Sequence, residues 1–157
     1  MKLVIDTSVL LKWFLEENDS ALARDLLASI VSGTATGHLP SLAIYEVQSG
    51  LIQNASADQA AQQMAMFWQL LNTDAMTVHE VSANLLQSGH KVASLDTKNQ
   101  GHVSPYDAVF HALALDLNAT LITADAAHVR KTKVAFGSVV LLEPVYDLRN
   151  NKARKAK

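Results

Sequence analysis

The chain has 157 residues, of which 49% are hydrophobic and 18% are charged, with no cysteine and a formal net charge of −2. This composition predicts a single globular domain with a substantial core, and it excludes a disulfide framework, a thiolate metal site and an extended disordered chain. No secretory signal is evident, and no apolar run approaches the ~18 residues of a membrane span, so we expect a cytoplasmic protein.

Positive charge is concentrated at the C-terminus. The last nine residues, RNNKARKAK, hold five of the thirteen basic residues, and all fifteen acidic residues precede them. We therefore expect a domain over residues 1–148 and a basic tail over residues 149–157. Since nucleic-acid-binding domains are usually basic, the acidic domain either does not bind nucleic acid or uses some of its acids to hold cations.

The first half of the chain predicts short apolar strands followed by helices. Strands are expected over residues 2–5 and 38–40, and helices over 9–15, 20–31, 41–53 and 57–72. In the last of these helices, Met64, Phe67, Trp68 and Leu71 recur at helical spacing. This stripe belongs either to the core or to a dimer interface, and its pattern does not separate the two.

The second half of the chain continues the alternation. Strands are expected over 76–81, 119–123 and 138–142, helices over 82–87, 104–117 and 124–131, and a polar loop over 96–105. Ser104 and Pro105 have the residue types of an N-cap and a first helical position. Short apolar strands alternating with helices predict an α/β fold with a parallel sheet covered on both faces.

Four carboxylates occupy positions that surface solvation does not explain well. Asp6 and Asp125 follow strands, Glu46 lies in the apolar helix SLAIYEVQSGLI, and Asp107 lies in the first turn of SPYDAVFHALAL. Taken singly, Asp6 and Asp125 could be helix caps, and Asp107 could complement a helix dipole. Ligands gather at the carboxyl ends of parallel strands, so we expect the four acids to share one site.

Clustered carboxylates repel one another, so they must take up protons or bind cations. Oxygen ligands without cysteine suit a hard divalent ion, Mg²⁺ or Mn²⁺. Two-metal sites of this kind activate water in phosphodiester cleavage. His111, four residues after Asp107, is either a helix side-chain partner of Asp107 or a contact to the site or to its substrate.

Beyond these patterns, the sequence resembles the PIN-domain ribonucleases, in particular the VapC toxins of VapBC toxin–antitoxin pairs. The stretches that carry the resemblance are VIDTSVLLKWFLEE (4–17), PSLAIYEV (40–47), SPYDAVFHALA (104–114) and LITADAAH (121–128). The family's acidic quartet falls on Asp6, Glu46, Asp107 and Asp125, and its hydroxyl position falls on Thr123. No acid of the quartet is missing, whereas the basic tail matches no family motif.

The resemblance implies a three-layer α/β/α domain that cleaves single-stranded RNA with Mg²⁺ or Mn²⁺. It also implies a homodimer and a cognate antitoxin that covers the active site. We expect Asp6, Glu46 and Asp107 to bind metal, and Asp125 to bind a second ion or orient the attacking water. Thr123 and Ser8 are expected to hydrogen-bond a carboxylate or a water on the metal.

Three other functions remain open at this point. One is an Mg²⁺-dependent phosphatase with an aspartyl nucleophile, although Ser8 stands where such enzymes usually carry a second aspartate. Another is a PIN-type nuclease that processes RNA without acting as a toxin. The last is a binding domain that kept the fold without catalysis, for which loss of an acid would be the mark.

Overall fold

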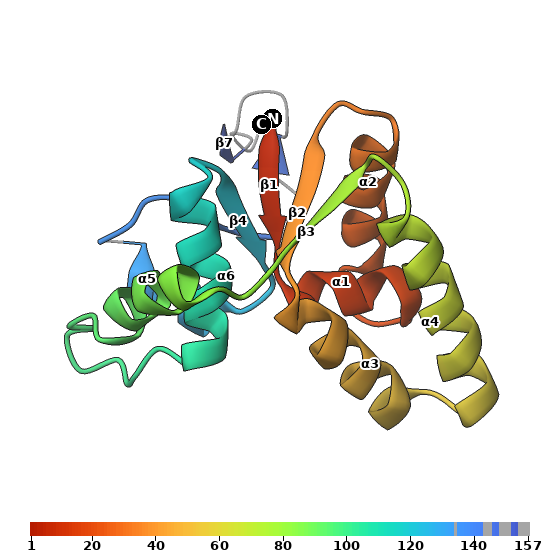
Figure 1. Ribbon diagram of the computed structural model, residues 1–157, viewed down its shortest axis with the longest axis horizontal. Helices are drawn as coiled ribbons and strands as arrows, with labels where there is room; N and C mark the ends of the chain where they lie inside the picture. Colours follow the sequence, from red (N-terminus) through yellow and green to blue (C-terminus); the bar gives the residue numbers. More distant parts are fainter. Residues whose placement is uncertain (134, 143–145, 148–151, 154–157) are drawn as a thin grey trace.

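The computed structural model describes residues 1–133, 135–142, 146–147 and 152–153. Its central sheet has five parallel strands in the order β3-β2-β1-β4-β5 (Figure 1). These strands are β1 (Lys2–Ile5), β2 (Thr36–Pro40), β3 (Met76–His79), β4 (Thr120–Thr123) and β5 (Val139–Leu141). The predicted parallel α/β sheet is therefore confirmed.

Seven helices accompany the sheet within the described residues. They are α1 (Thr7–Phe14), α2 (Ser20–Val31), α3 (Leu42–Asn54), α4 (Ala57–Leu71), α5 (Ala83–Ala93), α6 (Pro105–Asp116) and α7 (Ala126–Thr132). Helices α1 to α4 lie on one side of the sheet, and α5 and α6 lie on the other (Figure 1). This is the predicted three-layer α/β/α arrangement, and none of the described helices is long and apolar enough to cross a membrane.

The order of the strands creates a crevice at the end of β1. From β1 the chain builds outward through β2 to β3, and it then crosses back through α5 and α6 to place β4 on the other side of β1. In open parallel sheets, ligands bind at such a reversal, outside the carboxyl ends of the strands. Asp6 directly follows β1, and Asp125 follows β4 by two residues.

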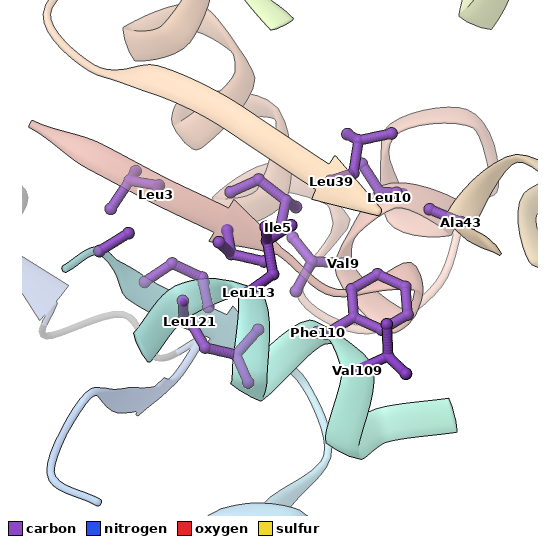
Figure 2. Packing of buried hydrophobic residues seen from close by; sticks show 14 of the residues in the cluster. Leu3, Ile5, Val9, Leu10, Leu39, Ala43, Val109, Phe110, Leu113 and Leu121 are labelled. Carbon is purple, nitrogen blue, oxygen red and sulfur yellow. The ribbon is translucent and has the colours of Figure 1, made fainter. Parts of the chain in front are cut away.

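The core lies where α6 packs on the sheet. Buried side chains of α6, among them Phe110 and Leu113, form one cluster with Ile5 of β1 and Leu121 of β4 (Figure 2). Every residue of α6 from Ala108 to Ala114 is buried. Ser104 caps the helix by accepting a hydrogen bond from the Tyr106 N–H at 3.2 Å, with Pro105 at the first position as predicted. This rigid helix carries Asp107 in its first turn.

Helix α5 is longer than predicted. It runs to Ala93 rather than ending near residue 87. The helix thus continues through Gly89, although glycine disfavours helix interiors by about 1 kcal/mol. Gly89 is buried where α5 packs on α6, and a Cβ there would lie in van der Waals contact with Val109 Cγ2, at 3.4 Å. Packing outweighs propensity at this position.

The stripe on α4 divides between core and surface. The Phe67 side chain is fully buried and meets Phe14 edge-on with ring centroids 6.0 Å apart. Trp68 is 46% exposed, whereas Met64 and Leu71 are partly buried. Met64 and Trp68 line an apolar groove of about 550 Å³ between α3 and α4. The stripe therefore serves both as core and as an exposed apolar surface.

The predicted basic tail is described only in part. Lys152–Ala153 forms the short strand β7, which pairs antiparallel with β6 (Tyr146–Asp147). Of the five basic residues that define the tail, only Lys152 is among the described residues, and the other four lie outside them: Arg149, Arg154, Lys155 and Lys157. The boundary at residue 148 stays a prediction.

Candidate active site

A cavity of about 370 Å³ lies at the carboxyl end of the sheet. Its walls come from the start of α1, from one face of α3, from the first turn of α6 and from the residue before α7. The lining residues are Asp6, Thr7, Ser8, Glu46, Ser49, Gly50, Gln53, Asp107 and Asp125. All four carboxylates predicted to share a site therefore lie around one cavity.

Asp6 lies at the centre of a hydroxyl network. Its Oδ2 accepts hydrogen bonds from Ser8 Oγ at 2.6 Å and from Thr123 Oγ1 at 2.5 Å. The Ala124 N–H donates to Ser8 Oγ, and the Asp125 N–H donates to Thr123 Oγ1, both at 3.0 Å. Asp6 occupies the N-cap position of α1, but its side chain makes no capping hydrogen bond. Capping therefore does not explain this carboxylate, which is only 8% exposed.

Replacing Thr123 with valine is expected to lower the free energy of unfolding by about 1–2 kcal/mol, because the buried Asp6 carboxylate loses a donor. Chemical denaturation measures the effect. Thr77→Val, at an exposed position of β3, is the control, and equal losses in both variants would contradict the role of Thr123.

Glu46 lies on the wall of the cavity that α3 forms. Its Oε2 accepts a hydrogen bond from Thr7 Oγ1 at 2.5 Å, which joins α3 to the start of α1. Burial raises the pKa of Glu46, the Thr7 hydrogen bond opposes that rise, and the negative charge of Asp6 adds to it. Glu46 therefore lies close enough to Asp6 for their charges to interact.

Asp107 is the most strongly perturbed of the four acids. Burial, together with the negative charges of Asp6, Asp125 and Glu46, raises the pKa of Asp107 to about 6, while the charge of Lys131 opposes this rise. Favourable interaction with the dipole of α6 would instead keep this carboxylate ionised. The four acids thus form one electrostatic unit that disfavours negative charge on Asp107.

Asp125 has a second, structural role. Its Oδ1 accepts from the Ala127 N–H at 2.7 Å and from the His128 N–H at 3.1 Å, which caps α7. The capping interpretation is therefore correct for Asp125. Only Oδ1 makes these bonds, and the same residue also lines the cavity.

The chemistry of the cavity fits a hard divalent cation. Its potential ligands are carboxylate and hydroxyl oxygens, which Mg²⁺ and Mn²⁺ prefer. Within the described part of the chain, no group of three or more His, Cys, Asp or Glu side chains is arranged to hold a metal ion. Asp6, Glu46 and Asp125 instead accept hydrogen bonds from their own neighbours. The acids would have to draw together to share a cation.

Four residues of the cavity wall were not identified from sequence: Thr7, Ser49, Gly50 and Gln53. The last three follow Glu46 at intervals of three, four and seven, so helical spacing from a candidate acid could have found them. A Cβ on Gly50 would come within 2.6 Å of Leu11 Cδ1. The glycine therefore lets α3 approach α1, where Thr7 meets Glu46.

Comparison with known proteins gives one family match. The family described as PIN domain matches residues 3–134. No curated protein matches this sequence.

Several solved structures share the fold. VapC20 from Mycobacterium tuberculosis, described as a sarcin-ricin loop cleaving toxin, aligns with a TM-score of 0.65 and 15% identity over 85% of this chain and 95% of its own. VapBC2 from Rickettsia felis, bound to a DNA fragment from its promoter, aligns with a TM-score of 0.64 and 15% identity over 90% of this chain and 97% of its own. FitAcB from Neisseria gonorrhoeae aligns with a TM-score of 0.62 and 13% identity over 90% of this chain and 97% of its own. At these identities, the likeness establishes the fold alone.

Proposed function

Since the chain belongs to the PIN domain family of nucleases, we propose that it is a divalent-metal-dependent endoribonuclease and the toxin of a type II toxin–antitoxin pair. The observation that carries this proposal is the gathering of Asp6, Glu46, Asp107 and Asp125 around one cavity. These acids come from four separate segments of the chain, and hydrophobic packing gives no reason to bring them together. A phosphodiester-cleaving metal site does give one.

In this proposal the four acids hold Mg²⁺ or Mn²⁺. When bound, the ions supply an activated water and neutralise charge on the phosphate. The chain's own hydroxyls orient the acids: Thr123 and Ser8 hold Asp6, and Thr7 holds Glu46.

The substrate side of the cavity is the polar face of α3. Ser49 and Gln53 line it and are joined by a hydrogen bond from Gln53 Nε2 to Ser49 Oγ at 3.1 Å. Such groups can contact the sugar and phosphate of a single strand, where hydroxyls and amides position RNA without reading its sequence. We propose that the RNA backbone enters along this face.

RNA cleavage by the purified protein, with and without Mn²⁺, tests the proposal directly. We expect cleavage that depends on the ion and disappears on chelation. Cleavage that continues undiminished in chelator would contradict a metal-dependent mechanism. No cleavage of any RNA under either condition would favour a binding domain that kept the fold.

Two alternatives remain within the same fold. A PIN-type nuclease that processes RNA would have the same chemistry, so growth arrest on expression separates a toxin from it. A phosphatase with Asp6 as nucleophile would usually carry a second aspartate two residues later, where this chain has Ser8, whose hydroxyl donates to Asp6 Oδ2.

We further propose a homodimer and a cognate antitoxin as partners, and a cytoplasmic location where RNA is available. The similar structure VapBC2 from Rickettsia felis is bound to a DNA fragment from its promoter. The apolar groove with Met64 and Trp68 supports a protein partner, because exposed apolar surfaces of this kind commonly mark interfaces. Light scattering of the purified chain measures the oligomeric state, and a monomer at micromolar concentration would contradict the homodimer.

A further inference from the structure

Two buried histidines join the helices that carry Asp107 and Asp125. We propose that His111 and His128 form a positioning link that fixes Asp125 relative to Asp107. The inference rests on the proposed function, since it concerns how the same acidic site is held together. Neither histidine lines the cavity, so the link would act through the acids and not on the substrate.

The geometry of the link is that of a buried hydrogen-bonded chain. His111 Nδ1 lies 3.0 Å from His128 Nε2, and His111 Nε2 lies 3.1 Å from Ser138 Oγ, just before β5. The His111 side chain is fully buried, and His128 is 3% exposed. Phe136 packs edge-on against the His111 ring, with centroids 5.4 Å apart.

Each histidine is tied to one of the acids. His111 lies four residues after Asp107, one turn further along α6. The His128 N–H donates to Asp125 Oδ1, and the Thr132 hydroxyl donates to the His128 carbonyl. Helix α7 has only seven residues and packs chiefly against β5. The histidine pair therefore supplies a direct polar connection from α7 to α6.

The protonation of the link follows from its surroundings. Burial lowers the pKa of His111 to about 4 and also lowers the pKa of His128, so both rings are neutral near pH 7. His128 Nδ1 is buried without a hydrogen-bond partner in the described part of the chain. A proton there would leave a donor unsatisfied. The consistent arrangement has His128 Nε2–H donating to His111 Nδ1, and His111 Nε2–H donating to Ser138 Oγ.

A second histidine pair in the chain provides a matched control. His38 Nδ1 lies 3.1 Å from His79 Nε2, in a contact between β2 and β3. The two rings are also close, with centroids 5.3 Å apart, compared with 5.2 Å for His111 and His128. Neither His38 nor His79 lines the acidic cavity. Breaking this pair removes a similar hydrogen bond without touching the helices that carry the acids.

The test compares His111→Phe with His38→Phe. We would measure the Mn²⁺ concentration that gives half of the full rise in melting temperature, together with kcat and KM for RNA cleavage. Both variants are expected to lower the melting temperature without metal. Only His111→Phe is expected to raise the Mn²⁺ midpoint and to lower kcat, each by about 10-fold or more, with KM little changed.

Two conservative variants keep the test decisive if His111→Phe does not fold. In His111→Asn the amide can take the place of Nδ1 and preserve the contact to His128, whereas in His111→Gln it can take the place of Nε2 and preserve the contact to Ser138. If the link positions Asp125, the Mn²⁺ midpoint should stay close to the wild-type value in His111→Asn and should rise in His111→Gln. Equal midpoints in the two variants would overturn it.

The remaining outcomes separate this inference from the proposed function. If the wild-type protein responds to Mn²⁺ and all His111 variants respond at the same concentration, the histidines only stabilise the core and the link is overturned. If the wild-type protein shows neither a Mn²⁺-dependent melting temperature nor cleavage, the proposed function fails and the inference fails with it.

Discussion

Replacing Asp6 with asparagine is expected to lower the rate of RNA cleavage by at least about 10³-fold. The loss should exceed the 10- to 100-fold typical of residues that only orient a ligand, because Asp6 is proposed to hold the metal itself. Asparagine has the same shape and keeps one oxygen to accept from Thr123 and Ser8. The fold should therefore persist, and the loss can be assigned to the missing charge. Single-turnover cleavage of a labelled RNA, in saturating Mn²⁺, measures the effect.

Asp25→Asn is the matched control for this variant. Asp25 is an exposed carboxylate on α2 and is not part of the cavity. The Asp25→Asn variant should cleave RNA at the wild-type rate. Cleavage by Asp6→Asn at the rate of Asp25→Asn would remove Asp6 from the site.

Saturating Mn²⁺ is expected to raise the melting temperature of the wild-type protein by about 5–10 °C. At 100 times its dissociation constant, a ligand stabilises the folded state by about 2.7 kcal/mol. For a chain of this length, each kcal/mol corresponds to roughly 2–4 °C. Asp107→Asn should lose most of the rise, because one of the proposed ligands is gone.

The same variant tests the charge repulsion within the site. Without metal, we expect Asp107→Asn to be more stable than wild type by about 1–2 kcal/mol at pH 7. A pKa of about 6, against 3.8 for a free side chain, corresponds to about 3 kcal/mol at most, and partial exposure of Asp107 reduces this by solvent screening. Chemical denaturation without metal measures the difference.

Asp58→Asn separates repulsion from a helix-dipole effect. Asp58 lies in the first turn of α4, as Asp107 lies in the first turn of α6. If both acids only complemented a dipole, both variants would lose up to about 1 kcal/mol. A less stable Asp107→Asn protein would therefore contradict a repulsive site.

The pH dependence of this difference has a definite sign. As the pH falls through about 6, folded Asp107 takes up a proton while the unfolded side chain stays ionised down to 3.8. Folding then becomes more favourable for the wild type, so the advantage of Asp107→Asn should shrink below pH 6 and vanish below about pH 4. An advantage that stays constant from pH 7 to pH 4 would point to a cause other than the Asp107 charge.

Local patterns in the sequence determined which segments form strands and helices. The strand at residues 2–5 and the helix at 20–31 were predicted with the observed bounds. The strand was predicted from its apolar run and the helix from apolar residues at helical spacing, and both patterns depend only on residues close together in the sequence. The four acids could also be identified, because each interrupts an apolar segment or follows a strand. Their roles in metal binding and catalysis stay predictions.

Contacts between distant segments were decided only by the tertiary structure. Thr7 donates to Glu46 across 39 residues, and Thr123 donates to Asp6 across 117. His111 likewise pairs with His128, 17 residues further along the chain, and not with Asp107 in its own helix. On α4, the sequence placed Phe67 and Trp68 in one stripe, yet Phe67 is buried and Trp68 is exposed. Helical periodicity indicates that a face is apolar, but what covers that face depends on how the strand order and the helix crossings bring the layers together.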